Sequence, residues 1–155
     1  MSTLGWFHTF TAVLALASGA VVLSMRKGTA RHRQIGWVYA GSMLALNLSA
    51  LMIYRLFGRF GPFHVAALIS LASLASAMIP AIRRKPEKKW LERHYYGASW
   101  SYIGLLAAAA SELITRVPAT VFWWGVLGAT LAVVAIGGTI IGVRAKHTLA
   151  TARSR

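Results

Sequence analysis

Five long apolar runs dominate the sequence of 155 residues and leave few folds open to it. The runs cover approximately residues 4–25, 34–57, 62–82, 95–115 and 118–143. As helices rising about 1.5 Å per residue, runs of this length cross a hydrocarbon core of about 30 Å. A backbone in that core must satisfy its own hydrogen bonds, and the runs lack the alternating pattern of a membrane strand. The sequence therefore predicts an all-α membrane protein, with residues 1–155 forming a single integral membrane domain.

The composition supports this class and excludes several others. Hydrophobic residues make up 57% of the chain and charged residues 13%, whereas soluble domains have about 45–50% and about 25%. The chain contains no cysteine, which excludes disulfide bonds, thiolate metal sites and a cysteine nucleophile.

The distribution of basic residues predicts the orientation of the helices. All but three of the 17 Lys and Arg residues lie between the first two runs, between the third and fourth, or after the fifth. The exceptions are Arg55, Arg59 and Arg116. The positive-inside rule then places the N-terminus outside and the C-terminus in the cytoplasm, after five crossings of the inner (plasma) membrane. The same rule explains the net charge of +14 without a nucleic acid, so the expected partner is the lipid bilayer.

Two prolines are expected to interrupt helices near the inner face. Pro80 is expected to bend or end the third helix, and Pro86 to break any helix through the basic loop that runs from Arg83 to His94. The short connections favour an up-down four-helix transmembrane core, with a fifth transmembrane helix packed alongside.

Histidines occur at matching positions in the first four runs. His8 and His64 lie near the outer ends of the first and third helices, and His32 and His94 near the inner ends of the second and fourth. His147 is expected to be solvated in the cytoplasmic tail. Ionisable side chains at such positions are costly in lipid and are therefore candidates for function.

Diagonal helices of a four-helix square suit a haem iron held by two imidazoles. In such a bundle the first and third helices are diagonal, as are the second and fourth. The pattern therefore predicts one haem site per leaflet, with His8 and His64 binding the outer iron and His32 and His94 the inner one. Such a pair of sites is the plan of a transmembrane electron conduit.

A single acidic residue in the fourth helix suggests an alternative chemistry. Glu112 lies five helical turns after His94 and on the same face. His8, His64 and Glu112 could together form a zinc or iron site with two imidazoles and one carboxylate. A simpler interpretation pairs Glu112 with Arg116, four residues later, at the end of the helix. The histidines themselves could equally be interfacial residues without a ligand.

The segment from Arg26 to Tyr39, RKGTARHRQIGWVY, carries a resemblance to a known family. With His8, His94 and the segment from Phe60 to His64, it resembles a bacterial family of small membrane proteins, domain of unknown function 2306. The resemblance covers residues 1 to about 115. It implies that the four histidines belong together, but it implies no activity. In general architecture alone, the chain is also similar to membrane dihaem proteins of the cytochrome b561 type.

These observations lead to one leading hypothesis and two alternatives. The first is a b-type haem protein, and possible oxidoreductase, that carries electrons across the bilayer through one or two haem b groups to an unidentified redox partner. Arg33 and Arg93 would then pair with haem propionates. The alternatives are the zinc or iron site and a non-enzymatic accessory subunit of the membrane. A homo-oligomer stays open in each case.

Overall fold

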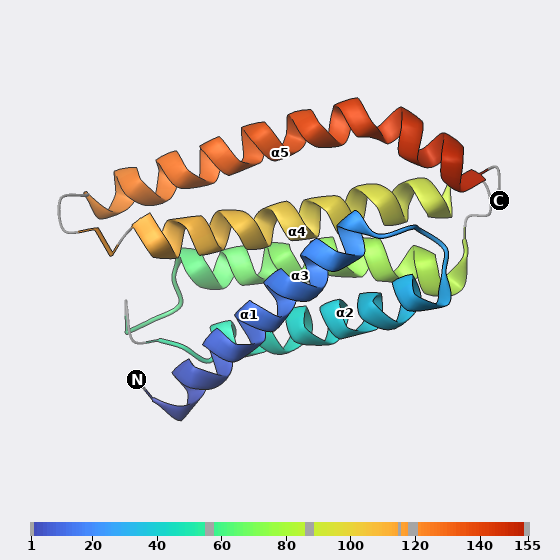
Figure 1. Ribbon diagram of the computed structural model, residues 1–155. Coiled ribbons are helices and arrows are strands. Elements are labelled where there is room, and N and C mark those ends of the chain that lie inside the picture. The colour runs from blue at the N-terminus through green and yellow to red at the C-terminus, as the bar shows by residue number, and fades with distance from the viewer. Residues whose placement is uncertain (1, 55–57, 86–88, 115, 118–120, 154–155) are drawn as a thin grey trace.

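The computed structural model describes residues 2–54, 58–85, 89–114, 116–117 and 121–153 (Figure 1). Within these residues the regular structure consists of five α-helices, so the predicted all-α class is confirmed. The helices are α1 (Thr3–Ser24), α2 (Ala30–Leu51), α3 (Pro62–Arg83), α4 (Trp90–Ile114) and α5 (Phe122–Arg153). Three of them, α1, α3 and α5, are long and apolar enough to cross a membrane. The crossings by α2 and α4, which carry more polar residues, stay predictions.

Helices α2, α3, α4 and α5 run roughly alongside one another, and α1 crosses them at an angle (Figure 1). Each packs against the next in the chain, and α1 also contacts α4, which closes a ring of the first four helices. Within this ring α1 is diagonal to α3, and α2 is diagonal to α4. Helix α5 packs mainly against α4, with one ring contact to α3 between Phe122 and Phe63, and it lies on the far side of α4 from α2 (Figure 1).

Several helix ends differ from those expected. Helix α2 begins at Ala30, because the Thr29 side chain accepts a hydrogen bond from the His32 amide and caps it. Helix α4 begins at Trp90, so His94 lies within the helix and not at its start. Helix α5 continues to Arg153, so the exposed His147 lies on a helix and not in a tail.

Pro80 does not end α3, since the helix continues through it to Arg83. Pro86 lies outside the described residues. The basic connection between α3 and α4 is shorter than expected, because residues 90–94 are helical.

The core of the ring is small and contains residues from all four helices. Its buried apolar members are Ala15, Tyr39, Ala40, Met43, Leu46, Leu74 and Leu105. Buried hydroxyls are common, and Thr11, Ser18 and Ser42 donate to carbonyls of their own helices. Large apolar side chains such as Ile69 and Trp124 are exposed on the outside. An apolar exterior around a core with small and polar residues is typical of helices that pack within lipid.

Candidate functional site

A tight turn between α1 and α2 determines where His32 lies. Lys27 donates from Nζ to the carbonyls of Val22 (2.7 Å) and Leu23 (2.6 Å), and so caps the C-terminal end of α1. Burial lowers the pKa of this lysine. Gly28 adopts a φ of +80°, which favours glycine, and Thr29 then begins α2. Each residue of the Lys-Gly-Thr motif therefore has a structural role in starting the helix that carries His32.

His32 and His94 lie together at the end of the bundle that contains this turn. Their ring centroids are 6.4 Å apart, and the ring planes are nearly perpendicular at 86°. The two histidines come from the diagonal helices α2 and α4, as the sequence pattern predicts. The Nδ1 atom of His32 is buried and has no hydrogen-bond partner.

The imidazole of His94 is oriented by the backbone of α3. Its Nδ1 lies 2.8 Å from the carbonyl oxygen of Ala77. A carbonyl can only accept, so Nδ1 carries the proton and Nε2 of the neutral ring keeps its lone pair. His94 therefore has a defined tautomer with Nε2 free to bind a metal.

Two residues bring this carbonyl and His94 close together. Gly97 lies against α3 so closely that a Cβ there would be 2.7 Å from the Ala77 nitrogen. Pro80 has no N–H to donate to the carbonyl of Ser76, and its ring crowds that carbonyl. Pro80 therefore leaves the Ser76 carbonyl without its helical donor, one residue before Ala77.

A pair of tyrosines fills the centre of the ring beyond His32. The Tyr39 hydroxyl hydrogen-bonds with Ser101 Oγ of α4 at 2.9 Å. The Tyr102 hydroxyl donates to the Leu16 carbonyl of α1 at 3.1 Å. Both rings pack over Gly19, where a Cβ would meet them at less than 3 Å. These contacts link α1, α2 and α4.

At the opposite end of the bundle, His8 is held by α2. Its Nδ1 lies 3.0 Å from Ser49 Oγ, and Ser49 donates its single hydroxyl proton to the Leu46 carbonyl at 2.8 Å. His8 Nδ1 must therefore be the donor. The Nε2 atom of the neutral His8 ring then carries a lone pair.

His64, at the same end, has the opposite tautomer. Its Nδ1 accepts a hydrogen bond from the Gly61 amide at 3.1 Å, so the neutral ring carries its proton on Nε2. This Nε2 is buried and has no partner. The rings of Tyr54 and Phe60 lie 4.6 and 4.9 Å from the imidazole. Among the ring contacts of the described residues, none joins His64 to His8.

Within the described residues, the three residues of the alternative metal site do not form a group that could hold a metal ion. Glu112 and Arg116 form an exposed ion pair with a distance of 2.5 Å between Oε1 and an Nη nitrogen, as the simpler interpretation predicts. Over the part of the chain that the structure describes, no group of three His, Asp or Glu residues could hold a metal ion. The set of His8, His64 and Glu112 therefore has no support from the geometry.

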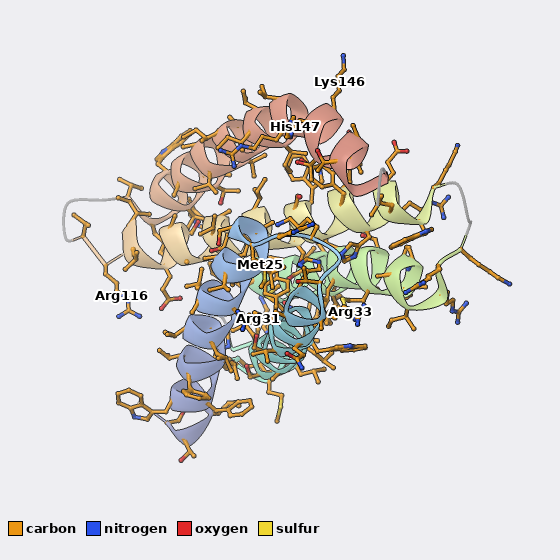
Figure 2. The ribbon with its side chains drawn as sticks, turned by 45° about the vertical axis from the view of Figure 1, so that its right-hand side comes forward. Met25, Arg31, Arg33, Arg116, Lys146 and His147 are labelled. Carbon is orange, nitrogen blue, oxygen red and sulfur yellow. The ribbon has the colours of Figure 1, made fainter. Side chains whose placement is uncertain are left out.

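The arginines next to the histidine pair are exposed. Arg33 and Arg93 each follow or precede a histidine of the pair directly and have exposed side chains. Figure 2 shows Arg31 and Arg33 on the first turns of α2, whereas Lys146 projects from α5 away from the other helices. Arg33 and Arg93 are thus exposed beside the His32–His94 pair and can bind an anionic group there.

Comparison with known proteins identifies the family. Residues 5–149 match the family described as Predicted membrane protein (DUF2306). The chain belongs to the DUF2306 family. The match continues past residue 115, so it includes α5 as well as the ring of four helices. No curated protein and no solved structure is detectably similar to this DUF2306 protein.

Sequence reasoning identified the histidines of the DUF2306 protein but not the groups that orient them. The Ala77 carbonyl could not have been found, because any residue provides a carbonyl. Pro80 was the one available signal, since a proline within an apolar helix disturbs the carbonyls one turn before it. Ser49 was one of many serines, and nothing in the sequence distinguished it as the partner of His8.

Proposed function

We propose that this protein is a membrane electron carrier that holds haem b between His32 and His94. The observation that carries the proposal is the approach of these two imidazoles from diagonal helices, with ring centroids 6.4 Å apart. With metal–nitrogen bonds of about 2 Å, imidazoles on opposite sides of one metal ion have ring centres roughly 6 Å apart. The observed spacing is compatible with that arrangement.

The hydrogen bonds of the pair also favour a metal ligand. Histidines that bind metals commonly donate their other N–H to a backbone carbonyl, which orients the ring and raises its basicity. His94 does so through Ala77. The buried Nδ1 of His32 lacks a partner, and leaving such an atom unpaired is costly, so His32 would bind the metal through Nδ1. Imidazole nitrogens are well-known axial ligands of haem iron.

The surrounding residues suit a haem at the edge of the membrane. Haem b supplies a one-electron redox couple when bound. Arg33 provides positive charge for a propionate at the rim, and the buried Tyr39 and the partly buried Tyr102 limit water in the core beyond. Electrons would be exchanged with a redox partner at the basic face of the protein.

The proposal includes the predicted topology. All five helices cross the membrane, α1–α4 form the transmembrane core, and α5 is a fifth crossing packed against α4. The N-terminus lies outside and the basic end, with His32 and His94, faces the cytoplasm. This orientation rests on the positive-inside rule.

A second haem between His8 and His64 has weaker support. Only His8 has an Nε2 lone pair, and His64 would have to break its hydrogen bond with Gly61 to become a ligand through Nε2. We therefore expect one haem per chain.

The test is the optical spectrum of the full-length protein purified in detergent from cells supplied with haem precursor. We expect one haem b per chain by pyridine haemochrome assay, with sharp visible bands after reduction by dithionite. His32→Ala and His94→Ala are each expected to remove it. His147→Ala, at an exposed histidine of α5, is the matched control and should retain it.

Two results would contradict the proposal. One is a protein that stays colourless after reconstitution with haem. This result contradicts the proposal whether or not metal analysis of the same sample finds stoichiometric zinc. The other is a haem that survives His32→Ala but is lost in His8→Ala or His64→Ala. Two haems per chain, with His8→Ala removing only one, would restore the outer site.

A further inference from the structure

A groove of about 870 Å³ follows the surface between α3 and α4 at the basic end of the bundle. The α3 side includes Ser73, Ser76 and Ile79, and the α4 side includes Lys89, Arg93 and Trp100. The groove is separate from the His32–His94 pair, since neither histidine lines it.

Small side chains create this hollow between two tightly packed helices. Gly97 and Ser76 line it, and a Cβ at Gly97 would lie 2.7 Å from Ser76 Oγ. The helix axes approach closely here, and the neighbouring small residue Ala75 leaves the space above the contact unfilled. The groove is therefore a consequence of the same packing that brings His94 to Ala77.

The chemistry of the groove changes along its length. Lys89 and Arg93 are exposed cations at the start of α4. Trp100 lies eleven residues after Lys89, which is about 16 Å along a helix. Glu92 also lines the groove, so the cations exceed the acids at this end. Beyond this cationic end the groove is lined by Ile79 and Trp100. These two residues lie nearer to the apolar middle of α3 and α4.

The groove opens onto a surface that faces lipid. Ile79 is 49% exposed, Ile82 is 59% exposed and Trp100 is 41% exposed. An occupant that enters from this side must be soluble in the bilayer, and one that reaches Lys89 and Arg93 must carry an anionic group. The cationic end is complementary to the phosphate of an anionic phospholipid, and the apolar channel matches its acyl chains.

We propose that this groove is a binding site for an anionic phospholipid of the bilayer. Its phosphate lies against Lys89 and Arg93, and one acyl chain follows the groove between Ile79 and Trp100. The site gives the α3–α4 pair a preference for anionic over zwitterionic lipid, and it does not depend on a bound haem. Cations near an anionic lipid surface contribute about 1 kcal/mol each.

The test uses the full-length protein in phosphatidylcholine vesicles that contain phosphatidylglycerol with brominated acyl chains, which quench nearby tryptophan. The signal of Trp100 is the difference between the wild-type protein and Trp100→Phe. We expect this signal to be quenched at low fractions of brominated phosphatidylglycerol but not of brominated phosphatidylcholine. The double variant Lys89→Gln and Arg93→Gln should weaken the preference roughly 10- to 30-fold.

A matched double variant, Arg144→Gln and Lys146→Gln, removes two exposed cations of α5 that do not line the groove. It is expected to keep the lipid preference, and circular dichroism of both double variants checks that the helices are retained. Equal quenching by the two lipids would overturn the proposal. So would an equal loss in the α5 variant, which indicates diffuse attraction, or displacement of the lipid by inorganic phosphate.

Discussion

His64 is the residue whose surroundings pose the sharpest question about a single side chain. It is 3% exposed, and its Nε2–H has no acceptor. An unsatisfied buried donor costs about 1–3 kcal/mol, whereas the hydrogen bond from Gly61 to Nδ1 contributes about 1 kcal/mol. We therefore predict that His64→Phe, which keeps an aromatic ring beside Tyr54 and Phe60, leaves the thermal unfolding midpoint in detergent unchanged or raises it.

His64→Ala provides the comparison, because it removes the same donor but also the ring. Loss of a buried ring leaves a cavity and costs a few kcal/mol, so its midpoint should fall clearly. If the unfolding midpoint of His64→Phe falls as far as that of His64→Ala, the Nε2–H of His64 has an acceptor in the folded protein. That result would mean that His64 donates a hydrogen bond to a bound group.

At the scale of the helices, the α3–α4 contact depends on Gly97. A Cβ at this position would meet the backbone nitrogen of Ala77 at 2.7 Å, and a backbone cannot turn aside as a flexible side chain can. Gly97→Ala is predicted to destabilise the fold by about 1–3 kcal/mol and to weaken haem binding. The destabilisation follows from the clash with the backbone of α3, and the weaker haem binding from moving His94 away from the Ala77 carbonyl. Thermal unfolding and the reduced haem spectrum measure them.

Gly104 is the matched control on the same helix. A Cβ there meets nothing within 4 Å, so Gly104→Ala should be neutral, or stabilising by up to about 1 kcal/mol, through its higher helix propensity. Equal effects of the two substitutions would show that the close approach at Gly97 is unimportant.

At the scale of the whole molecule, the absence of cysteine makes the topology directly testable. Single cysteines can replace Arg59 and Arg116, which lie in the α2–α3 and α4–α5 connections, and Lys85 and Lys146, which lie in the α3–α4 connection and in the last part of α5. Five crossings with the N-terminus outside predict that a membrane-impermeant maleimide labels only Arg59→Cys and Arg116→Cys in intact spheroplasts.

After permeabilisation, Lys85→Cys and Lys146→Cys should be labelled as well. Labelling of Lys85→Cys in intact cells, with Arg59→Cys protected, would reverse the orientation. If Arg59→Cys and Lys85→Cys react from the same side of the membrane, α3 does not cross it. If Lys85→Cys and Arg116→Cys react from the same side, α4 does not cross it. These outcomes test the crossings of α3 and α4, and the labelling of Arg116→Cys compared with Lys146→Cys tests the crossing of α5.

The class of protein could be predicted from the sequence because its determinants are local and additive. The length of an apolar run predicts a helix wherever the helix lies, and the count of cations in each connection predicts which connections share a side. The family resemblance is also local, since Lys27, Gly28 and Thr29 all form the turn between α1 and α2. Helix ends were less predictable: α2 begins at Thr29's cap and α5 continues through charged residues to Arg153.

The sequence by itself thus determined the helical membrane class, the family and the set of four histidines. The tertiary structure decided that, of the two predicted pairs, His32 and His94 make a ring contact, and it decided the tautomers of His8, His64 and His94. In lipid the outer face of a helix is apolar and the inner face contains apolar as well as small polar residues, so polarity alone does not fix its rotation. The orientation of His94 also depends on the Ala77 carbonyl and the orientation of His8 on the Ser49 hydroxyl, and such pairings exist only once the helices have packed.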